Sequence, residues 1–197
     1  MTEAKHPNKA ARIYAMETAR LGIWVFLATE VLLFGGLFTA YTVFRIRYPE
    51  LFHAEHLKLS RPLGGLNTVI LITSSLTMAM AVDAARQGRR GRLQLFLLCT
   101  ILLAGGFLGV KFVEWSGEFH HGNLPSSNLF FSLYFTLTGL HGLHVLAGMA
   151  VLTAFLVMTR QGRFTRTYHT PVEIGGLYWH FVDLVWIYLF PLIYLVG

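Results

Sequence analysis

The sequence has little cysteine and little charge. Only one cysteine, Cys99, occurs among 197 residues, so an intrachain disulfide and a cysteine-based zinc or iron–sulfur site are both excluded. Charged residues make up 13% of the chain, about half the share found in an average soluble domain. Because 54% of the residues are hydrophobic, a disordered chain is excluded as well. An integral membrane protein remains.

Sequence signals for two further function classes are also missing. The chain contains no G-x-S-x-G nucleophile elbow, which argues against a serine hydrolase or protease. Its net charge of +6 does not indicate nucleic-acid binding, because basic residues in a membrane protein anchor the cytoplasmic loops. We therefore expect no nucleic-acid partner.

Five apolar stretches are long enough to cross a membrane as helices, which takes roughly 20 residues each. Their apolar residues are continuous, whereas barrel strands would be about ten residues long and would alternate in polarity. The links leave no room for a soluble domain, so residues 1–197 are predicted to form one all-α membrane domain. The longest link, residues 45–65, contains Pro49 and Pro62 and is expected to break helices and strands. The expected helices span residues 20–44, 66–85, 93–115, 129–158 and 172–196.

Basic residues predict the orientation of these helices. In a five-helix protein, the N-terminal arm, the second link and the fourth link share one membrane face. These three regions carry eleven lysines and arginines, against four on the opposite face. Since cytoplasmic loops are enriched in such residues, the N-terminus is predicted to be cytoplasmic and the C-terminus external.

Ionisable side chains inside the predicted helices are functional candidates, because an unpaired charge at membrane depth is costly. Lys111 and Glu114 share a helix face and are expected to pair at the outer membrane interface, next to Trp115 as an interfacial anchor. Glu30 has no cation within one turn, so it is either a structural hydrogen-bonding group or a reactive carboxyl on a proton or lipid pathway. The full set of candidates is Glu30, Glu114, His141, His144, His180 and Asp183.

Two pairs of polar residues, each with members three positions apart, lie in the last two helices. His141 and His144 form a bare H-x-x-H, which is a weak metal signal, and we interpret them as neutral imidazoles that hydrogen-bond across the bundle. Asp183 lies one turn from His180 and is placed to fix its tautomer. Two alternatives stay open: a stand-alone cytochrome with a haem between His141 and His180, and a small proton transporter with Glu30 and the two histidines of the fourth helix as its relay.

Five motifs, one from each predicted helix, point to a known family. They are WVFLATEVLLFGGLFTAYTVFR, PLGGLNTVILITSS, VKFVEWSGEF, TGLHGLHVLAG and YWHFVDLVW. Together they resemble subunit III of the haem–copper terminal oxidases, the cytochrome c oxidase subunit 3 family, over about residues 21–195. The chain looks like the short bacterial form, which lacks the first two of the seven helices of larger members.

The resemblance implies an accessory subunit of a proton-pumping oxygen reductase, in the inner membrane of a bacterium. Such a subunit carries no redox metal, and haem and copper are expected in its partner subunits. It would contact mainly subunit I, together with other oxidase subunits and membrane lipids, and it would support proton uptake and protect the catalytic site during turnover. Cytochrome c is favoured as the electron donor of the complex. A quinol oxidase and a relative associated with nitric oxide reductase are the alternatives.

The resemblance also assigns roles to two residues. Glu30 corresponds to the buried carboxyl that reacts with hydrophobic carbodiimides in this family. The lipid-binding arginine of the family corresponds to Met158, so Arg160 is its expected substitute as a phospholipid headgroup ligand. Without the first two helices, the lipid cleft of larger members cannot form here in the same way.

Helix depth predicts one specific contact between Glu30 and the fourth helix. Glu30 lies ten residues past Arg20, which is roughly 15 Å along a helix. Counted inward from Met158, His144 is roughly 21 Å deep and His141 roughly 25 Å deep. His144 is the better match, so we predict a hydrogen bond between Glu30 and His144. The bond would join a neutral glutamic acid to a neutral histidine, or a carboxylate to an imidazolium.

Overall fold

The computed structural model describes residues 9–196, and five of their helices are long and apolar enough to cross a membrane. This confirms the predicted all-helical membrane fold. The elements in chain order are α1 (Lys9–Arg47), α2 (Pro49–His56), α3 (Arg61–Arg86), α4 (Arg90–His120), α5 (Leu129–Arg160) and α6 (Thr170–Phe190), with a wider π-type turn at Pro191–Leu195.

The helices follow the predicted segments and extend beyond most of their ends. One prediction was wrong: the link expected to break helices contains α2, which begins at Pro49. Proline suits the first turn of a helix, because its missing N–H would have no partner there. At the other end of the chain, α6 gives way to the wider turn at Pro191, since proline cannot donate the next helical hydrogen bond.

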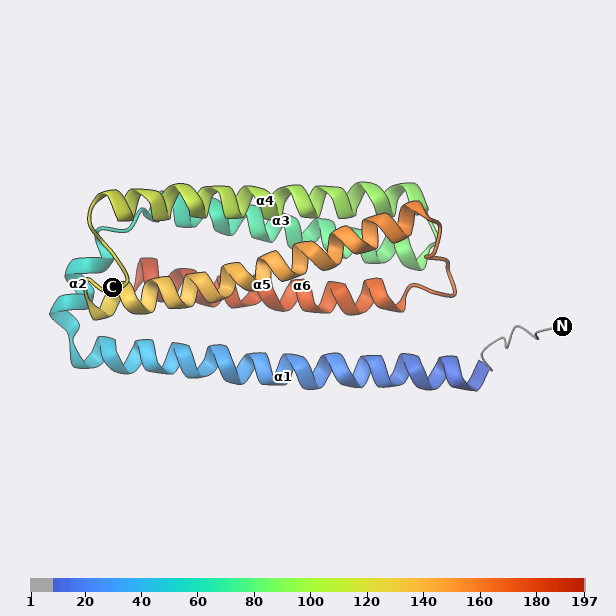
Figure 1. Ribbon diagram of the computed structural model, residues 1–197, viewed down its shortest axis with the longest axis horizontal. Helices are drawn as coiled ribbons and strands as arrows, with labels where there is room; N and C mark the ends of the chain where they lie inside the picture. Colours follow the sequence, from blue (N-terminus) through green and yellow to red (C-terminus); the bar gives the residue numbers. More distant parts are fainter. Residues whose placement is uncertain (1–8, 197) are drawn as a thin grey trace.

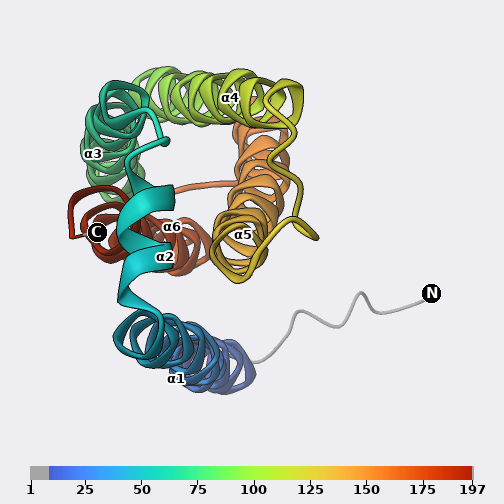
Figure 2. The same cartoon turned by 90° about the vertical axis from the view of Figure 1, so that its left-hand side faces the viewer.

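Helices α3, α4, α5 and α6 form a ring when viewed along their axes, and α1 lies outside this ring beside α5 and α6 (Figure 2). Only 6% of the most apolar 18-residue stretch of α1 is buried, against 28% to 44% of the corresponding stretches in the ring helices. The buried apolar side chains of α1 are Leu27, Phe34 and Tyr41, and their seven-residue spacing is that of a helix–helix seam. A narrow seam therefore attaches α1 to the rest of the chain.

Aromatic rings fill the ring of four helices, and glycines make room for them. Trp179 and Trp186 of α6 are fully buried. A Cβ added at Gly148 of α5 would lie 2.7 Å from the Trp179 ring, and one added at Gly175 of α6 would clash with the Phe155 ring. Contacts this short leave no room for a side chain, so these two glycines set the close approach of α5 and α6.

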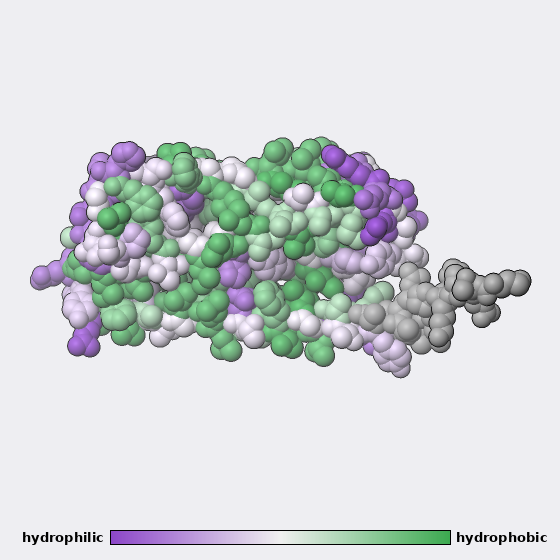
Figure 3. Space-filling view, in the orientation of Figure 1, coloured by the Kyte–Doolittle hydropathy of each residue, from purple (hydrophilic) through white to green (hydrophobic). Residues whose placement is uncertain are grey.

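The two ends of the molecule are more polar than its middle (Figure 3). The α3–α4 and α5–α6 connections lie at the same end of the bundle as the beginning of the α1 ribbon (Figure 1). At this end the Glu173 carboxylate of α6 forms ion pairs with two arginines. Arg86 Nε of α3 lies 2.6 Å from one of its oxygens, and Arg20 Nη2 of α1 lies 3.4 Å from the other. One carboxylate thus ties three helices together next to the basic connections.

Candidate functional site

The predicted contact between α1 and α5 is present. Nε2 of His144 lies 2.9 Å from Oε2 of Glu30, and the two side chains are 15% and 13% exposed. Glu30 stands on the α1 seam between Leu27 and Phe34. The Phe34 ring packs edge-on against the His144 ring at 5.2 Å, so an aromatic side chain covers the pair from the same seam.

The other nitrogen of His144 restricts the protonation of the pair. Nδ1 lies 2.8 Å from the backbone oxygen of Leu140, and a carbonyl oxygen only accepts, so Nδ1 carries a proton. In a neutral imidazole Nε2 is then the acceptor and Glu30 must donate. In an imidazolium Nε2 donates and Glu30 is a carboxylate. Either way one proton lies between Glu30 and Nε2, which makes the pair able to hold and pass a single proton.

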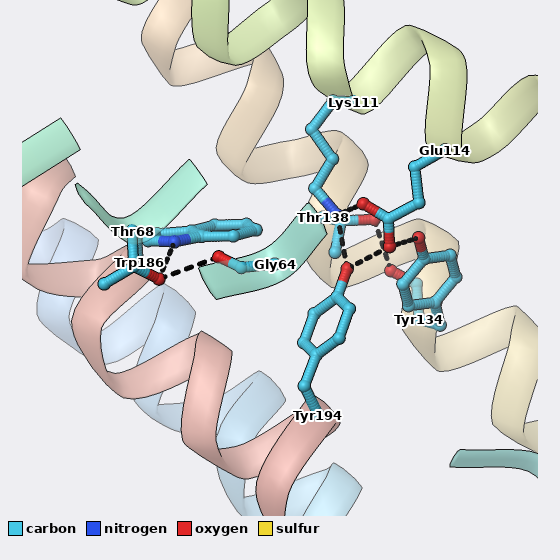
Figure 4. A network of polar contacts seen from close by, with 8 residues as sticks. All are labelled: Gly64, Thr68, Lys111, Glu114, Tyr134, Thr138, Trp186 and Tyr194. Carbon is cyan, nitrogen blue, oxygen red and sulfur yellow. Dashed lines mark hydrogen bonds and ion pairs between the residues drawn. The ribbon is translucent and has the colours of Figure 1, made fainter. Parts of the chain in front are cut away.

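A second polar cluster surrounds Glu114 inside the ring of four helices (Figure 4). Lys111 Nζ donates to Glu114 Oε2 at 3.0 Å and to the Tyr194 hydroxyl at 2.5 Å. The hydroxyls of Tyr134 and Tyr194 both donate to Glu114 Oε1, at 2.9 Å and 2.5 Å. Lys111 also lies 4.9 Å from the centre of the Trp186 ring, a cation–π distance.

The cluster confirms the pairing of Lys111 with Glu114 but corrects its surroundings. The pair is buried within the protein, with 7% of Lys111 and 4% of Glu114 exposed. Its tyrosine partners come from α5 and from the turn after α6, and no local spacing in the sequence connects them to α4. A further buried carboxylate, Glu118, accepts from Asn123 at 2.7 Å and was also missed by the sequence reasoning.

The prediction that both histidines of α5 hydrogen-bond across the bundle was wrong for His141. His141 is fully buried, and neither ring nitrogen has a hydrogen-bond partner among the described residues. Its ring lies 5.5 Å from Phe107 and 5.3 Å from Trp186. Three residues turn a helix by about 300°, so His144 reaches the α1 seam while His141 faces the aromatic interior.

The predicted contact between Asp183 and His180 is also absent. Nδ1 of His180 instead lies 2.7 Å from the hydroxyl of Ser75 on α3. Asp183 is buried, and neither of its oxygens makes a hydrogen bond of acceptable geometry with a described residue, although Ser75 lies beside it. A bis-histidine haem would need the imidazoles of His141 and His180. In the structure His141 packs between aromatic rings, and His180 contacts the Ser75 hydroxyl.

Arg160, the expected headgroup ligand, is exposed in the last turn of α5. The end of α5, where Arg160 is the last residue, lies at the same end of the bundle as the α3–α4 connection (Figure 1). No group of three histidine, cysteine, aspartate or glutamate side chains that could hold a metal ion occurs among the described residues.

Comparisons with known proteins give one consistent result. The sequence model of a family described as cytochrome c oxidase subunit III matches residues 3–197. Quinol oxidase subunit 3 of Bacillus subtilis is 34% identical, with 100% of this chain and 98% of the relative covered. Cytochrome c oxidase subunit 3 of Bacillus sp. (strain PS3) is 35% identical over 90% of this chain and 85% of the relative. The Synechocystis cytochrome c oxidase subunit 3 is 40% identical over 89% of this chain and 74% of the relative.

Proposed function

We propose, from the premise that this chain belongs to the cytochrome c oxidase subunit III family, a specific role for it in the oxidase complex. The chain is an accessory subunit of a haem–copper oxidase, associates with other oxidase subunits, and is a multi-pass bacterial membrane protein. Its proposed role is to pack against the catalytic subunit I, to stabilise it during turnover and to support its proton uptake. Haem and copper belong to the partner subunits in this proposal.

The observation that carries the proton-linked role is the Glu30–His144 pair. The pair holds one proton at a largely covered position on α1, the membrane-spanning helix with the smallest buried share. Glu30→Gln keeps a donor for Nε2 but removes the carboxyl that can take up and release a proton. Purified oxidase carrying Glu30→Gln should assemble normally, while its turnover at high pH, where proton supply limits, falls below that of the unmodified enzyme. Unchanged turnover across the pH range would contradict the proton-linked role.

The electron donor is proposed to be cytochrome c. This proposal is based on the glutamate at position 30 and on the family resemblance. Relatives named as cytochrome c oxidase and as quinol oxidase subunits have similar identity, at 35% and 34%, so the alternative is a quinol oxidase. Oxygen consumption by the purified complex should be supported by reduced cytochrome c. Activity with a quinol alone would establish the alternative.

The orientation of the chain is proposed from its basic residues. The arginine-bearing connections after α3 and after α5 lie at one end of the bundle (Figure 1), and the positive-inside rule places that end in the cytoplasm. The N-terminus would then be cytoplasmic and the C-terminus external. Reporter fusions at the two ends should be active only in the matching compartment, and the reverse pattern would overturn the orientation.

A phospholipid headgroup is proposed to contact Arg160, which is exposed at the proposed cytoplasmic end of α5. Arg160→Gln should reduce the amount of anionic lipid that co-purifies with the complex, whereas Arg163→Gln serves as a matched control in the adjacent connection. Equal lipid content in the unmodified complex and in both variants would contradict the contact.

A further inference from the structure

The ring of four helices contains buried polar atoms that the protein itself does not satisfy. Both ring nitrogens of His141 and both amide atoms of Asn67 lack hydrogen-bond partners among the described residues, and both side chains are 0% exposed. Leaving one such group unpaired costs about 1–3 kcal/mol. Buried polar groups are almost always hydrogen-bonded, to protein or to ordered water, so the unpaired atoms of these two side chains require an explanation.

The Trp186 indole contacts His141 and the turn of α3 that carries Asn67. The Trp186 ring lies against His141, and its Nε1 donates to Thr68, the residue after Asn67, at 3.1 Å. The ammonium of Lys111 lies over the same Trp186 ring. Residues from α3, α4, α5 and α6 thus meet around one indole, and Figure 4 shows Lys111, Thr68 and Trp186 in this layer.

Lys111 has one donor left for this layer. An ammonium group carries three N–H donors, and Lys111 uses two of them, on Glu114 Oε2 and on the Tyr194 hydroxyl.

We propose that ordered water occupies the layer around Trp186, accepting a hydrogen bond from Lys111 and donating one to His141. Asn67 supplies a further donor and acceptor for the same water or for a second one. A buried water typically makes two to four hydrogen bonds, which matches the donors and acceptors that these three side chains leave over. The site connects the Lys111–Glu114 cluster to His141, and it is separate from the Glu30–His144 pair on the α1 seam.

Radiolytic hydroxyl-radical labelling of the purified oxidase complex tests this site, because a bound water produces radicals that modify the side chains it touches. Phe107 and Phe131 are matched reporters, since both are fully buried and only Phe107 contacts His141. We expect Phe107 to be labelled at least fivefold more than Phe131 in the unmodified complex. Equal labelling of the two phenylalanines would overturn the proposal.

Two variants of His141 assign the water to that side chain. His141→Leu removes both nitrogens, so Phe107 labelling should fall to the level of Phe131. His141→Gln keeps a donor and an acceptor, so the difference between the two phenylalanines should persist. Strong Phe107 labelling in the leucine variant would show that His141 does not hold the water, and this would refute the site as proposed. The unmodified complex alone is sufficient to test the proposal if the leucine variant does not assemble.

Discussion

Removing the Glu30 carboxyl should loosen α1 from the other four membrane helices. In Glu30→Ala, Nε2 of His144 loses its partner, the carboxyl that lies 2.9 Å away in the native chain. Side-chain hydrogen bonds between membrane helices contribute about 0.6–2 kcal/mol, and an unpaired covered nitrogen costs about 1–3 kcal/mol. These two terms overlap, because both describe the same bond. We therefore expect a net loss of about 1–2 kcal/mol, or about 5- to 30-fold in the equilibrium between closed and open α1.

Hydrogen–deuterium exchange in the purified complex measures this opening helix by helix. Backbone amides of α1 around residues 27–41 should exchange about 5- to 30-fold faster in Glu30→Ala, while amides in the ring helices change little. Leu32→Ala is the matched control on the same helix, because Leu32 is 76% exposed in the chain and makes no seam contact. Glu30→Gln should behave like the native chain, since its amide N–H can donate to Nε2.

Two results would refute this reasoning. If α1 amides exchange no faster in Glu30→Ala than in Leu32→Ala, the bond to His144 does not hold the helix. If Glu30→Gln is as loose as Glu30→Ala, the bond depends on charge and not on a donor for Nε2. The second result would also identify the pair as a carboxylate with an imidazolium.

Three further predictions concern the ring helices and the complex. Lys111→Met should lower the free energy of unfolding by about 3–5 kcal/mol, because it leaves a buried carboxylate without its cation; the double variant with Glu114→Leu should recover most of that loss in thermal melts of the complex, and no recovery would contradict the pairing. Gly148→Leu should cost at least about 1–3 kcal/mol by overpacking against Trp179, whereas Gly142→Ala, which meets open space, should melt like the native protein. Oxidase prepared without this subunit should start near its normal rate and lose activity during turnover, and a stable rate over many turnovers would disprove the protective role.

Composition and run length were sufficient to predict the fold, because the membrane imposes a strong requirement. Every backbone polar group in a bilayer must be satisfied inside its own helix or a closed barrel, so long apolar runs predict helices directly. The position of α1 outside the ring was not predictable in this way. Its apolar residues repeat every seven positions at Leu27, Phe34 and Tyr41, but its other faces are equally apolar, so hydropathy alone does not distinguish the seam.

Candidate residues were easier to predict than their partners. A charge in an apolar helix is visible in the sequence, and depth along two antiparallel helices was enough to pair Glu30 with His144. A spacing of three residues correctly predicted the pairing of Lys111 with Glu114. The same spacing failed for Asp183 and His180, because Asp183 is buried in the bundle and His180 contacts Ser75. The two tyrosines that bond Glu114 are far from it in the sequence: Tyr194 is 80 positions away and Tyr134 is 20 positions away. No local pattern records such contacts.

The Glu30–His144 pair also gives α1 a defined register on the ring. The apolar seam residues Leu27 and Phe34 are both large, so a shift of α1 by two turns would exchange similar side chains at small cost. Such a shift would separate the Glu30 carboxyl from Nε2 and leave two polar groups unpaired against lipid, which is expensive at membrane depth. A single polar pair in an apolar seam specifies register in this way. The bond that holds one proton between α1 and α5 therefore also fixes where that proton lies along the bundle. Glu30→Gln is the substitution that separates the two roles, because it keeps the register but cannot transfer a proton.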